Sequence, residues 1–322
     1  MSALELIQLN LLTPVVLAFF LGMAATLLRS DLKMPDELYQ GLSIYLLLAI
    51  GLKGGVELSA AAPREFLIPA GGAVLLGLAV PLWCYALLRK IGRLTVADSA
   101  ALAAHYGSVS AVTFLATLAF LAALGVPHEG FMPALLAIME VPAIVVALLL
   151  ARSRVPERTP WRELAREILT GKSILLLAGG LLIGLITGRE GFAKVEGFFV
   201  TPFQGVLALF LLEMGMVAAR RFGDLRKVGW FLVGFGIVMP LLHGALGIYV
   251  GKWCGLSMGG SMILGVLAAS ASYIAAPAAV RLSLPQANPT YYLTASLAIT
   301  FPFNLTFGIP LYYAFARFAY GV

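Results

Sequence analysis

Long, continuous apolar stretches separated by short polar loops dominate the pattern of this chain. A helix that spans a bilayer needs roughly 20 mostly apolar residues. Because the stretches are continuous rather than alternating, they favour helices over strands. Ten of them approach or exceed the length of a span: 11–28, 38–52, 66–88, 97–123, 131–151, 173–188, 202–219, 228–251, 260–280 and 290–316. The pattern therefore predicts an all-α membrane protein with ten transmembrane helices.

One distinctly polar segment divides these stretches into two sets of five. It covers 152–172 and carries six basic residues and two prolines. We therefore expect a first five-helix repeat over 1–151, a cytoplasmic linker over 152–172 and a second, inverted five-helix repeat over 173–322. The simplest interpretation of the linker is a retained cytoplasmic loop; a dedicated partner site is the alternative.

Matched features in the two sets predict the internal repeat. The separation between Thr95 and Ser110 equals the separation between Ser257 and Ser272. Further pairs follow the same order: 46–58 with 207–219, Pro81 with Pro240, and Glu140-Val141-Pro142 with Thr300-Phe301-Pro302. An odd number of spans per repeat makes the second copy enter the membrane upside down, which is typical of secondary transporters.

Composition and charge agree with a membrane protein. The 322 residues are 61% hydrophobic and 12% charged, whereas soluble domains carry about 25% charge. This composition excludes a soluble enzyme. It also means that the net charge of +6 does not indicate a nucleic-acid-binding protein. The two cysteines, Cys84 and Cys254, lie in apolar runs and predict neither a disulfide framework nor a transition-metal site.

The distribution of Lys and Arg predicts the orientation. Sixteen of the 22 basic residues lie in loops on one side of the membrane: 29–37, 89–96, 152–172, 220–227 and 281–289. The side richer in Lys and Arg is cytoplasmic in most multi-pass proteins. We therefore expect a bacterial inner (plasma) membrane protein with both termini outside.

Two candidate spans have small hydroxyl residues at their centres, in 105–113 and 268–277. If each span breaks there, Ser110 and Ser272 are suitable N-caps for the half-helices that follow. Two such positively polarised helix ends, facing each other, make an anion site without an arginine. The alternative is that these small residues only allow close helix packing.

Polar groups inside the spans are the other candidates. A carboxylate at the bilayer centre costs about 3 kcal/mol, so Glu140 and Glu213 are functional candidates. Glu140 suits a sodium ion or, alternatively, a structural hydrogen bond, and Glu213 can instead pair with a basic side chain. Asn304 can give a carbonyl oxygen to an ion or bond another helix. Lys53 and Glu57 are expected to form a helix-end pair.

The chain resembles the sodium-dependent bicarbonate transporter family first known from cyanobacteria. The matching stretches, in order, are IGLKGG (50–55), GSVS (107–110), MEVPA (139–143), MGM (214–216), LRKV (225–228), LAASAS (267–272) and RLSLPQANP (281–289). The resemblance implies two inverted repeats, a core part that moves against a scaffold, a homotrimer in the lipid bilayer, and coupled uptake of bicarbonate with a sodium ion. It also implies a PII-like cytoplasmic regulator, although the linker here is shorter than in cyanobacterial members.

The resemblance also implies the site residues. Its matching positions are Gly107, Ser108, Ser110 and Thr113 at the first break, Ser270 and Ser272 at the second, and Glu140. With Tyr273 and Asn304 added from their places in the chain, the expected substrate-binding set is Gly107, Ser108, Ser110, Ser270, Ser272 and Tyr273, and the expected sodium-binding set is Glu140, Thr113, Ser110, Ser272 and Asn304. The chain departs from the family pattern in the second broken segment, where Ala271, Tyr273 and Ala275 stand in place of oxygen-bearing residues, and Glu140 replaces a shorter aspartate.

The leading hypothesis is thus a secondary active transporter that takes up bicarbonate or a similar small anion with sodium. A proton-coupled transporter of another small anion or carboxylate is the first alternative, with Glu140 as the proton carrier. An anion-sensing membrane scaffold without transport, which reports through 152–172, is the second. No paired acid and base, nucleophile motif or cofactor fingerprint indicates an enzyme.

Overall fold

We describe the protein from a computed structural model, which covers residues 3–152 and 160–322. These residues form helices joined by turns and short loops, with no strand among them. Arg154 and Arg158 of the basic linker lie outside the described residues. In the first half the helices are α1 (Ala3–Leu11), α2 (Pro14–Leu27), α3 (Asp36–Ala60), α4 (Pro63–Lys90), α5 (Val96–Gly107), α6 (Ala111–Ala123), α7 (Met132–Glu140) and α8 (Pro142–Arg152).

The second half also alternates long and broken helices. Its elements are α9 (Trp161–Leu169), α10 (Lys172–Ala193), α11 (Glu196–Phe199), α12 (Phe203–Arg220), the 3₁₀ turn η1 (Phe222–Asp224), α13 (Leu225–Trp253), α14 (Met258–Ala269), α15 (Ala275–Ser283), α16 (Pro289–Leu293), α17 (Phe301–Phe303) and α18 (Ile309–Tyr320). Two π-helical segments, η2 (Thr294–Thr300) and η3 (Asn304–Gly308), lie on either side of α17.

Seven helical runs in the described residues are long and apolar enough to cross a membrane. The number is eight if the bent pair α1 and α2, which meet at 69°, forms one span. One run, from Glu196 to Trp253, contains both α12 and α13, and α14 counts only as a shorter apolar helix. The all-helical, multi-pass prediction is therefore confirmed, and the number of ten spans stays a prediction.

Several predicted boundaries change. The first span, expected at 11–28, bends between α1 and α2 because Pro14 begins a new helix capped by Thr13. The second span is longer than the expected 38–52, since α3 begins at Asp36 and ends at Ala60. The sixth reaches Ala193 beyond a break at Gly188, whose φ of 58° suits a residue without a Cβ.

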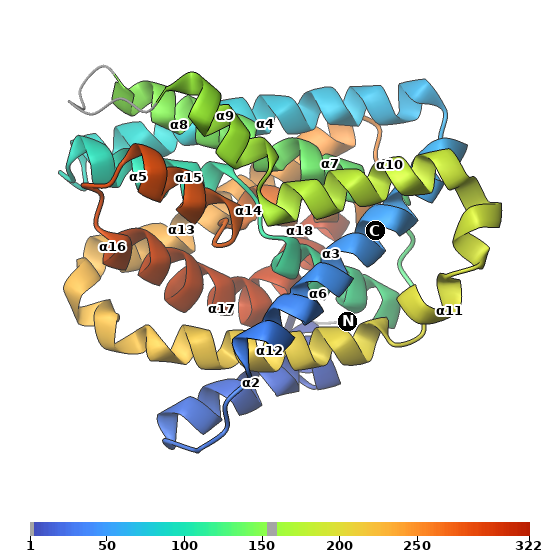
Figure 1. Cartoon of the computed structure of the whole chain (residues 1–322), viewed down its shortest axis with the longest axis horizontal. Helices are drawn as coiled ribbons and strands as arrows, with labels where there is room; N and C mark the ends of the chain where they lie inside the picture. Colours follow the sequence, from blue (N-terminus) through green and yellow to red (C-terminus); the bar gives the residue numbers. More distant parts are fainter. Residues whose placement is uncertain (1–2, 153–159) are drawn as a thin grey trace.

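Four helices pack as two tight pairs, α2 with α12 and α3 with α10, with α12 also contacting α3. In Figure 1, α2 and α12 lie along the lower edge of the view and α4 along the upper edge. We call α2, α3, α10 and α12 the four-helix group. The broken helices and their neighbours α4, α7, α8, α13 and α18 make up the remaining body of the protein.

In both pairs the two helices come into backbone contact at glycine residues, and they do so in the same way. A Cβ on Gly22 of α2 would meet the carbonyl oxygen of Leu212 in α12, and a Cβ on Gly215 would meet the carbonyl of Phe19. In the pair α3 and α10, a Cβ on Gly184 would meet the carbonyl of Leu52, and a Cβ on Gly55 would meet that of Leu181. On each of the four helices, the glycine lies three residues after the residue whose carbonyl contacts the partner helix. Small residues allow membrane helices to approach at backbone distance.

The broken helices lie at the centre of the molecule. In the run from Val96 to Ala123, 78% of the most apolar window is buried, against 17% for α10. The outer helices α4, α10 and α13 instead present exposed leucines such as Leu75, Leu182 and Leu242. Apolar side chains face lipid, while the hydroxyl-bearing breaks are kept inside protein, as backbone without helical hydrogen bonds requires.

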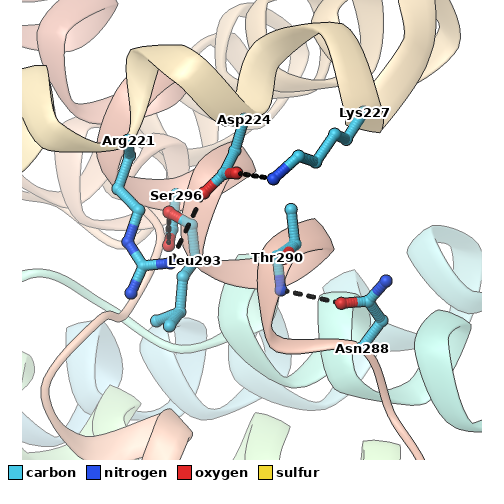
Figure 2. Close-up of polar contacts among 7 residues, drawn as sticks. All are labelled: Arg221, Asp224, Lys227, Asn288, Thr290, Leu293 and Ser296. Carbon is cyan, nitrogen blue, oxygen red and sulfur yellow. Dashed lines mark hydrogen bonds and ion pairs between the residues drawn. The ribbon is translucent and has the colours of Figure 1, made fainter.

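The basic loops gather at one end of the molecule, which we call the basic end. Figure 1 shows the start of α5 together with α9 and α16 on the left, and the end of α10 and α11 on the right. At the basic end, the loop between α12 and α13 holds Asp224 between Arg221 and Lys227, next to the start of the last span (Figure 2). There Asn288 caps α16 through the N–H of Thr290 (Figure 2).

Candidate functional site

The first break follows α5 and precedes α6. Thr95 begins α5 by accepting the N–H of Asp98, and α5 ends at Gly107. After two extended residues, Ser110 caps α6, and its Oγ accepts the N–H of Thr113 at 3.2 Å. The interruption at 107–110 and the N-cap role of Ser110 are therefore as predicted.

The second break follows α14 and precedes α15. Ser257 begins α14 in the same way that Thr95 begins α5, because its Oγ accepts the N–H of Gly260. The N-cap position of α15 is Ile274, which has no side-chain cap. Ser272 instead accepts the N–H of Ala276 from two residues further back. The prediction of an N-cap at Ser272 was thus wrong in position, although its hydroxyl still binds the first turn of α15.

The two breaks bond directly to each other. The backbone N–H of Ser110 donates to the Oγ of Ser270 at 2.8 Å. The backbone N–H of Ser272 donates to the carbonyl oxygen of His105 at 2.8 Å. Each broken helix therefore supplies an acceptor for an N–H of the other, from the last turn of α5 in one case and from the residue that ends α14 in the other, and these bonds hold the two breaks together.

Glu140 lies beside this crossing, at the junction of α7 and α8. Pro142 has no N–H and cannot continue a helix without loss of a hydrogen bond, so the helix breaks at Val141. The Oγ of Ser108 donates to the backbone carbonyl of Glu140 at 3.0 Å. The carboxylate of Glu140 accepts a bond of 3.3 Å from the Oγ of Ser173, at the start of α10. Glu140 is only 2% exposed.

A small cavity joins these groups. Its volume is about 10 Å³, which is near the minimum for one water molecule, so in this structure it has room for one small dehydrated ion. Its polar lining comes from four segments of the chain: Ser110, Glu140, Ser173, Ser272 and Tyr273. The Tyr273 hydroxyl lies near Ser110 but makes no hydrogen bond of normal geometry among the described residues, which leaves it available to a ligand.

The other predicted site residues surround the cavity without lining it. Gly107 packs against α4 and α8, where an added Cβ would lie 2.8 Å from Pro81 and 2.7 Å from Ala143. Thr113 donates its hydroxyl to the Oγ of Ser110 at 3.1 Å. Asn304 donates to the carbonyl of Ala269 at 2.9 Å, at the end of α14. These contacts hold the two breaks in place.

Glu213, the other candidate acid, lies away from this cavity. Its carboxylate is 3.5 Å from Arg220 on the same helix, α12. The alternative of pairing with a basic side chain is therefore the one that the structure bears out. Ser173, by contrast, was missed by the sequence analysis. It is a single serine at the start of a span, 33 residues from Glu140, and no motif or spacing connects the two.

Chemically, the cavity offers ligands for both signs of charge. The carboxylate of Glu140 and the hydroxyl oxygens of Ser110 and Ser272 are hard oxygen donors that suit a sodium ion. In the first turns of α6 and α15, the hydroxyls of Ser110 and Ser272 already accept the N–H groups of Thr113 and Ala276, and Pro277 has no N–H. The first-turn N–H groups that remain have no acceptor inside their own helices and carry the positive end of the helix dipole. A small anion next to the cation can therefore bind without a basic side chain.

Two larger cavities lie between the four-helix group and the rest of the protein. The inner cavity, at the basic end, has a volume of about 360 Å³ and shares Ser173, Ile274 and Ala275 with the small cavity. The outer cavity, at the opposite end, has a volume of about 510 Å³ and is lined by residues such as Lys53, Leu118 and Pro133. The small cavity shares no residue with the outer one.

This arrangement defines a multi-pass helical membrane protein with two broken helices that cross beside a buried carboxylate. The sequence model of the Na⁺-dependent bicarbonate transporter superfamily matches residues 14–317 of the chain. The protein therefore belongs to that superfamily, and the resemblance found in the sequence is confirmed. No curated protein sequence matches the chain.

Proposed function

We propose that this protein is a secondary active transporter that takes up bicarbonate, or a similar small anion, together with sodium by alternating access. The carrying observation is the crossing of two helix breaks beside Glu140, with hydroxyls and a carboxylate around one small cavity. The superfamily name supports bicarbonate as the substrate. The coupling ion is argued from the oxygen-rich, cysteine-free donor set.

In the proposed architecture, ten spans form two inverted five-helix repeats. The matched glycine–carbonyl contacts support this, because the pseudo-twofold axis of two inverted repeats would exchange the pair α2 and α12 with the pair α10 and α3. A second match supports it at the loops. The carboxylate of Glu129 accepts the N–H of Ser257 at the start of α14, and the carboxylate of Asp98, in the first turn of α5, accepts the N–H of Asn288. Each broken helix thus begins against the loop that follows the other.

In the proposed site, Glu140, Ser110 and Ser272 bind sodium, and Thr113 and Asn304 hold the surrounding backbone in place. The anion binds between the starts of α6 and α15, near the hydroxyl of Tyr273, when movement of the broken helices has widened the cavity, because in this structure it has room for only one small ion. Ser108 and Ser270 position the crossing through their bonds to Glu140 and Ser110. Each ion then raises the affinity for the other, because opposite charges attract and the coupling must be reciprocal.

Alternating access is supported by the positions of the inner and outer cavities. Both lie between the four-helix group and the broken helices. In this structure the inner cavity meets the site, while about two helical turns separate the outer cavity from it. Movement of the broken helices against the four-helix group would exchange these connections.

The remaining expectations are also proposals. The basic end faces the cytoplasm and both termini face outward, as the Lys and Arg distribution indicates. A homotrimer and a PII-like cytoplasmic regulator are proposed on the resemblance alone.

The decisive experiment is uptake of labelled bicarbonate into proteoliposomes, with and without a sodium gradient. We expect sodium-dependent uptake in the wild type and a loss of apparent sodium affinity of at least roughly tenfold in Glu140→Gln, because a charged ligand is removed. Glu213→Gln is the matched control, since Glu213 is also buried but pairs with Arg220.

Three results would contradict the proposal. Uptake that follows a pH gradient and ignores sodium would select proton coupling through Glu140. Anion binding without flux would select the sensing scaffold. Unchanged sodium dependence in Glu140→Gln would remove this residue from the coupling site.

A further inference from the structure

Lys53 lies inside α3 rather than in its last turn, and its side chain is exposed. It is seven residues before the last residue of α3, Ala60, which places it about 10 Å inside the helix end at 1.5 Å per residue. Its neighbours fix the orientation of the helix. Gly55 touches the backbone of Leu181, and a Cβ on Gly54 would lie 2.6 Å from Pro133. These two faces are closed by other helices, and Lys53 points into the outer cavity.

The ammonium group of Lys53 has no counter-ion within the described part of the chain. Glu57 is one turn away and lines the same cavity, yet no ion pair within 4.0 Å joins the two described side chains. Glu57 instead packs against Gly130, where any added Cβ would collide with its side chain. The expected helix-end pair of Lys53 and Glu57 is therefore not formed.

The rest of the lining adds the side-chain amide of Gln204, whose NH₂ group is a hydrogen-bond donor, and the ring of His128, whose Nδ1 already bonds the backbone carbonyl of Glu129 at 3.1 Å. His128 and Gln204 line the cavity from the loop before α7 and from the start of α12. The remaining wall is apolar and aromatic, with Phe192, Phe199 and Phe203. An ionised lysine at this depth is costly unless water or a counter-ion accompanies it, and such residues mark ion pathways. The cavity volume of about 510 Å³ is far larger than one small ion and its first water shell.

We propose that Lys53 forms a second, outer binding site that collects a small monovalent oxyanion before it reaches the crossing. This inference rests on the proposed function and adds a step to it. Leu118 lies eight residues beyond Ser110 along α6 and Pro133 seven residues before Glu140 along α7. The outer site is therefore about 10–12 Å from the small cavity at the crossing by helix rise. The two are separate binding sites, which the anion would occupy one after the other.

Charge substitution at Lys53 tests the role in uptake. In Lys53→Gln we expect the KM for bicarbonate to rise about fivefold with little change in maximal rate, the effect of one unit charge at about 4 Å in water. Uptake below KM should also lose part of its dependence on ionic strength, since salt screens the attraction. Lys53→Arg keeps the charge and should stay near wild type. Equal KM and salt dependence in Lys53→Gln and wild type would overturn the proposal.

Thiol labelling tests the site without relying on transport. The probe variant is Lys53→Cys with Cys254→Ala, because Cys84 is buried. A membrane-impermeant methanethiosulfonate should react with it from the side of the outer cavity, and bicarbonate or nitrate should slow the reaction. Ser59→Cys is the matched control, since Ser59 is exposed on the same helix outside the cavity lining. It should react without protection by anions.

The sign of the attached charge separates the remaining outcomes. When a cationic reagent is attached to Lys53→Cys, the KM for bicarbonate should fall towards the wild-type value. When an anionic reagent is attached, the KM should rise further. Absence of bicarbonate uptake in the wild type, with anion protection of Lys53→Cys intact, would contradict the proposed function and leave the outer site supported. Normal uptake without reaction or without anion protection at Lys53→Cys would contradict the outer site alone.

Discussion

The backbone N–H of Ser110 donates a 2.8 Å hydrogen bond to the side-chain oxygen of Ser270, 160 residues away. Both residues are buried. The bond joins the capping residue of one half-helix to the end of the opposite broken helix. A buried N–H without an acceptor is costly, so this contact explains why the first break stays open inside the membrane region.

Ser270→Ala should therefore weaken the crossing. The N–H of Ser110 would remain buried without an acceptor, at a cost of about 1–3 kcal/mol. We expect a lower melting temperature in detergent and a strong loss of uptake. Ser296→Ala serves as the control, because the Ser296 hydroxyl is buried but bonds only to carbonyls of its own helix. Equal melting temperatures and uptake for both variants would show that the contact between the breaks is dispensable.

Ser173→Ala should act through Glu140. Loss of the 3.3 Å bond from Ser173 removes a hydrogen bond to a charged group, worth about 1.5–3 kcal/mol. Because the bond fixes the carboxylate against the cavity, we expect a higher sodium concentration for half-maximal uptake with expression unchanged. Ser99→Ala should have no such effect, since the buried Ser99 hydroxyl has no partner in the described part of the chain. A normal sodium response in Ser173→Ala would separate Ser173 from the ion site.

The glycine contacts of α10 predict two opposite results on one helix. In Gly184→Ala the new methyl group meets the backbone carbonyl of Leu52, and such overpacking costs about 1–3 kcal/mol. In Gly179→Ala nothing lies within 4 Å, and alanine favours the helix by up to about 1 kcal/mol. Thermal unfolding of the purified variants measures both. Gly184→Ala as stable as Gly179→Ala would mean that α3 and α10 do not approach this closely.

Orientation can be measured with single cysteines in a Cys254→Ala background. We expect Ala62→Cys, at the end opposite the basic loops, to react with an impermeant maleimide added to intact cells. Thr170→Cys, at the basic end, should react only after the membrane is permeabilised. The reverse pattern would place the basic end outside and contradict the Lys and Arg distribution.

The sequence alone was sufficient for the membrane class, the superfamily and the two helix breaks. Apolar stretches of span length leave little choice of fold class, because only helices and closed barrels satisfy the backbone in lipid. The equal separations from Thr95 to Ser110 and from Ser257 to Ser272 indicated both breaks. The N-cap role was confirmed for Ser110, whereas the N-cap position of α15 is Ile274 rather than Ser272. The break between α7 and α8 was not predicted from the sequence, although Pro142 accounts for it locally, because proline has no N–H with which to continue the helix.

The tertiary structure decided which of these residues meet. Ser173 donates to the carboxylate of Glu140, Ser108 donates to its backbone carbonyl, and Lys53 and Glu57 line one cavity without forming an ion pair. None of these relations follows from spacing, because helix packing brings together residues from helices that are distant in the chain. The sequence carries local backbone preferences, whereas a contact such as that between Ser110 and Ser270, 160 residues apart, forms only in the packed structure.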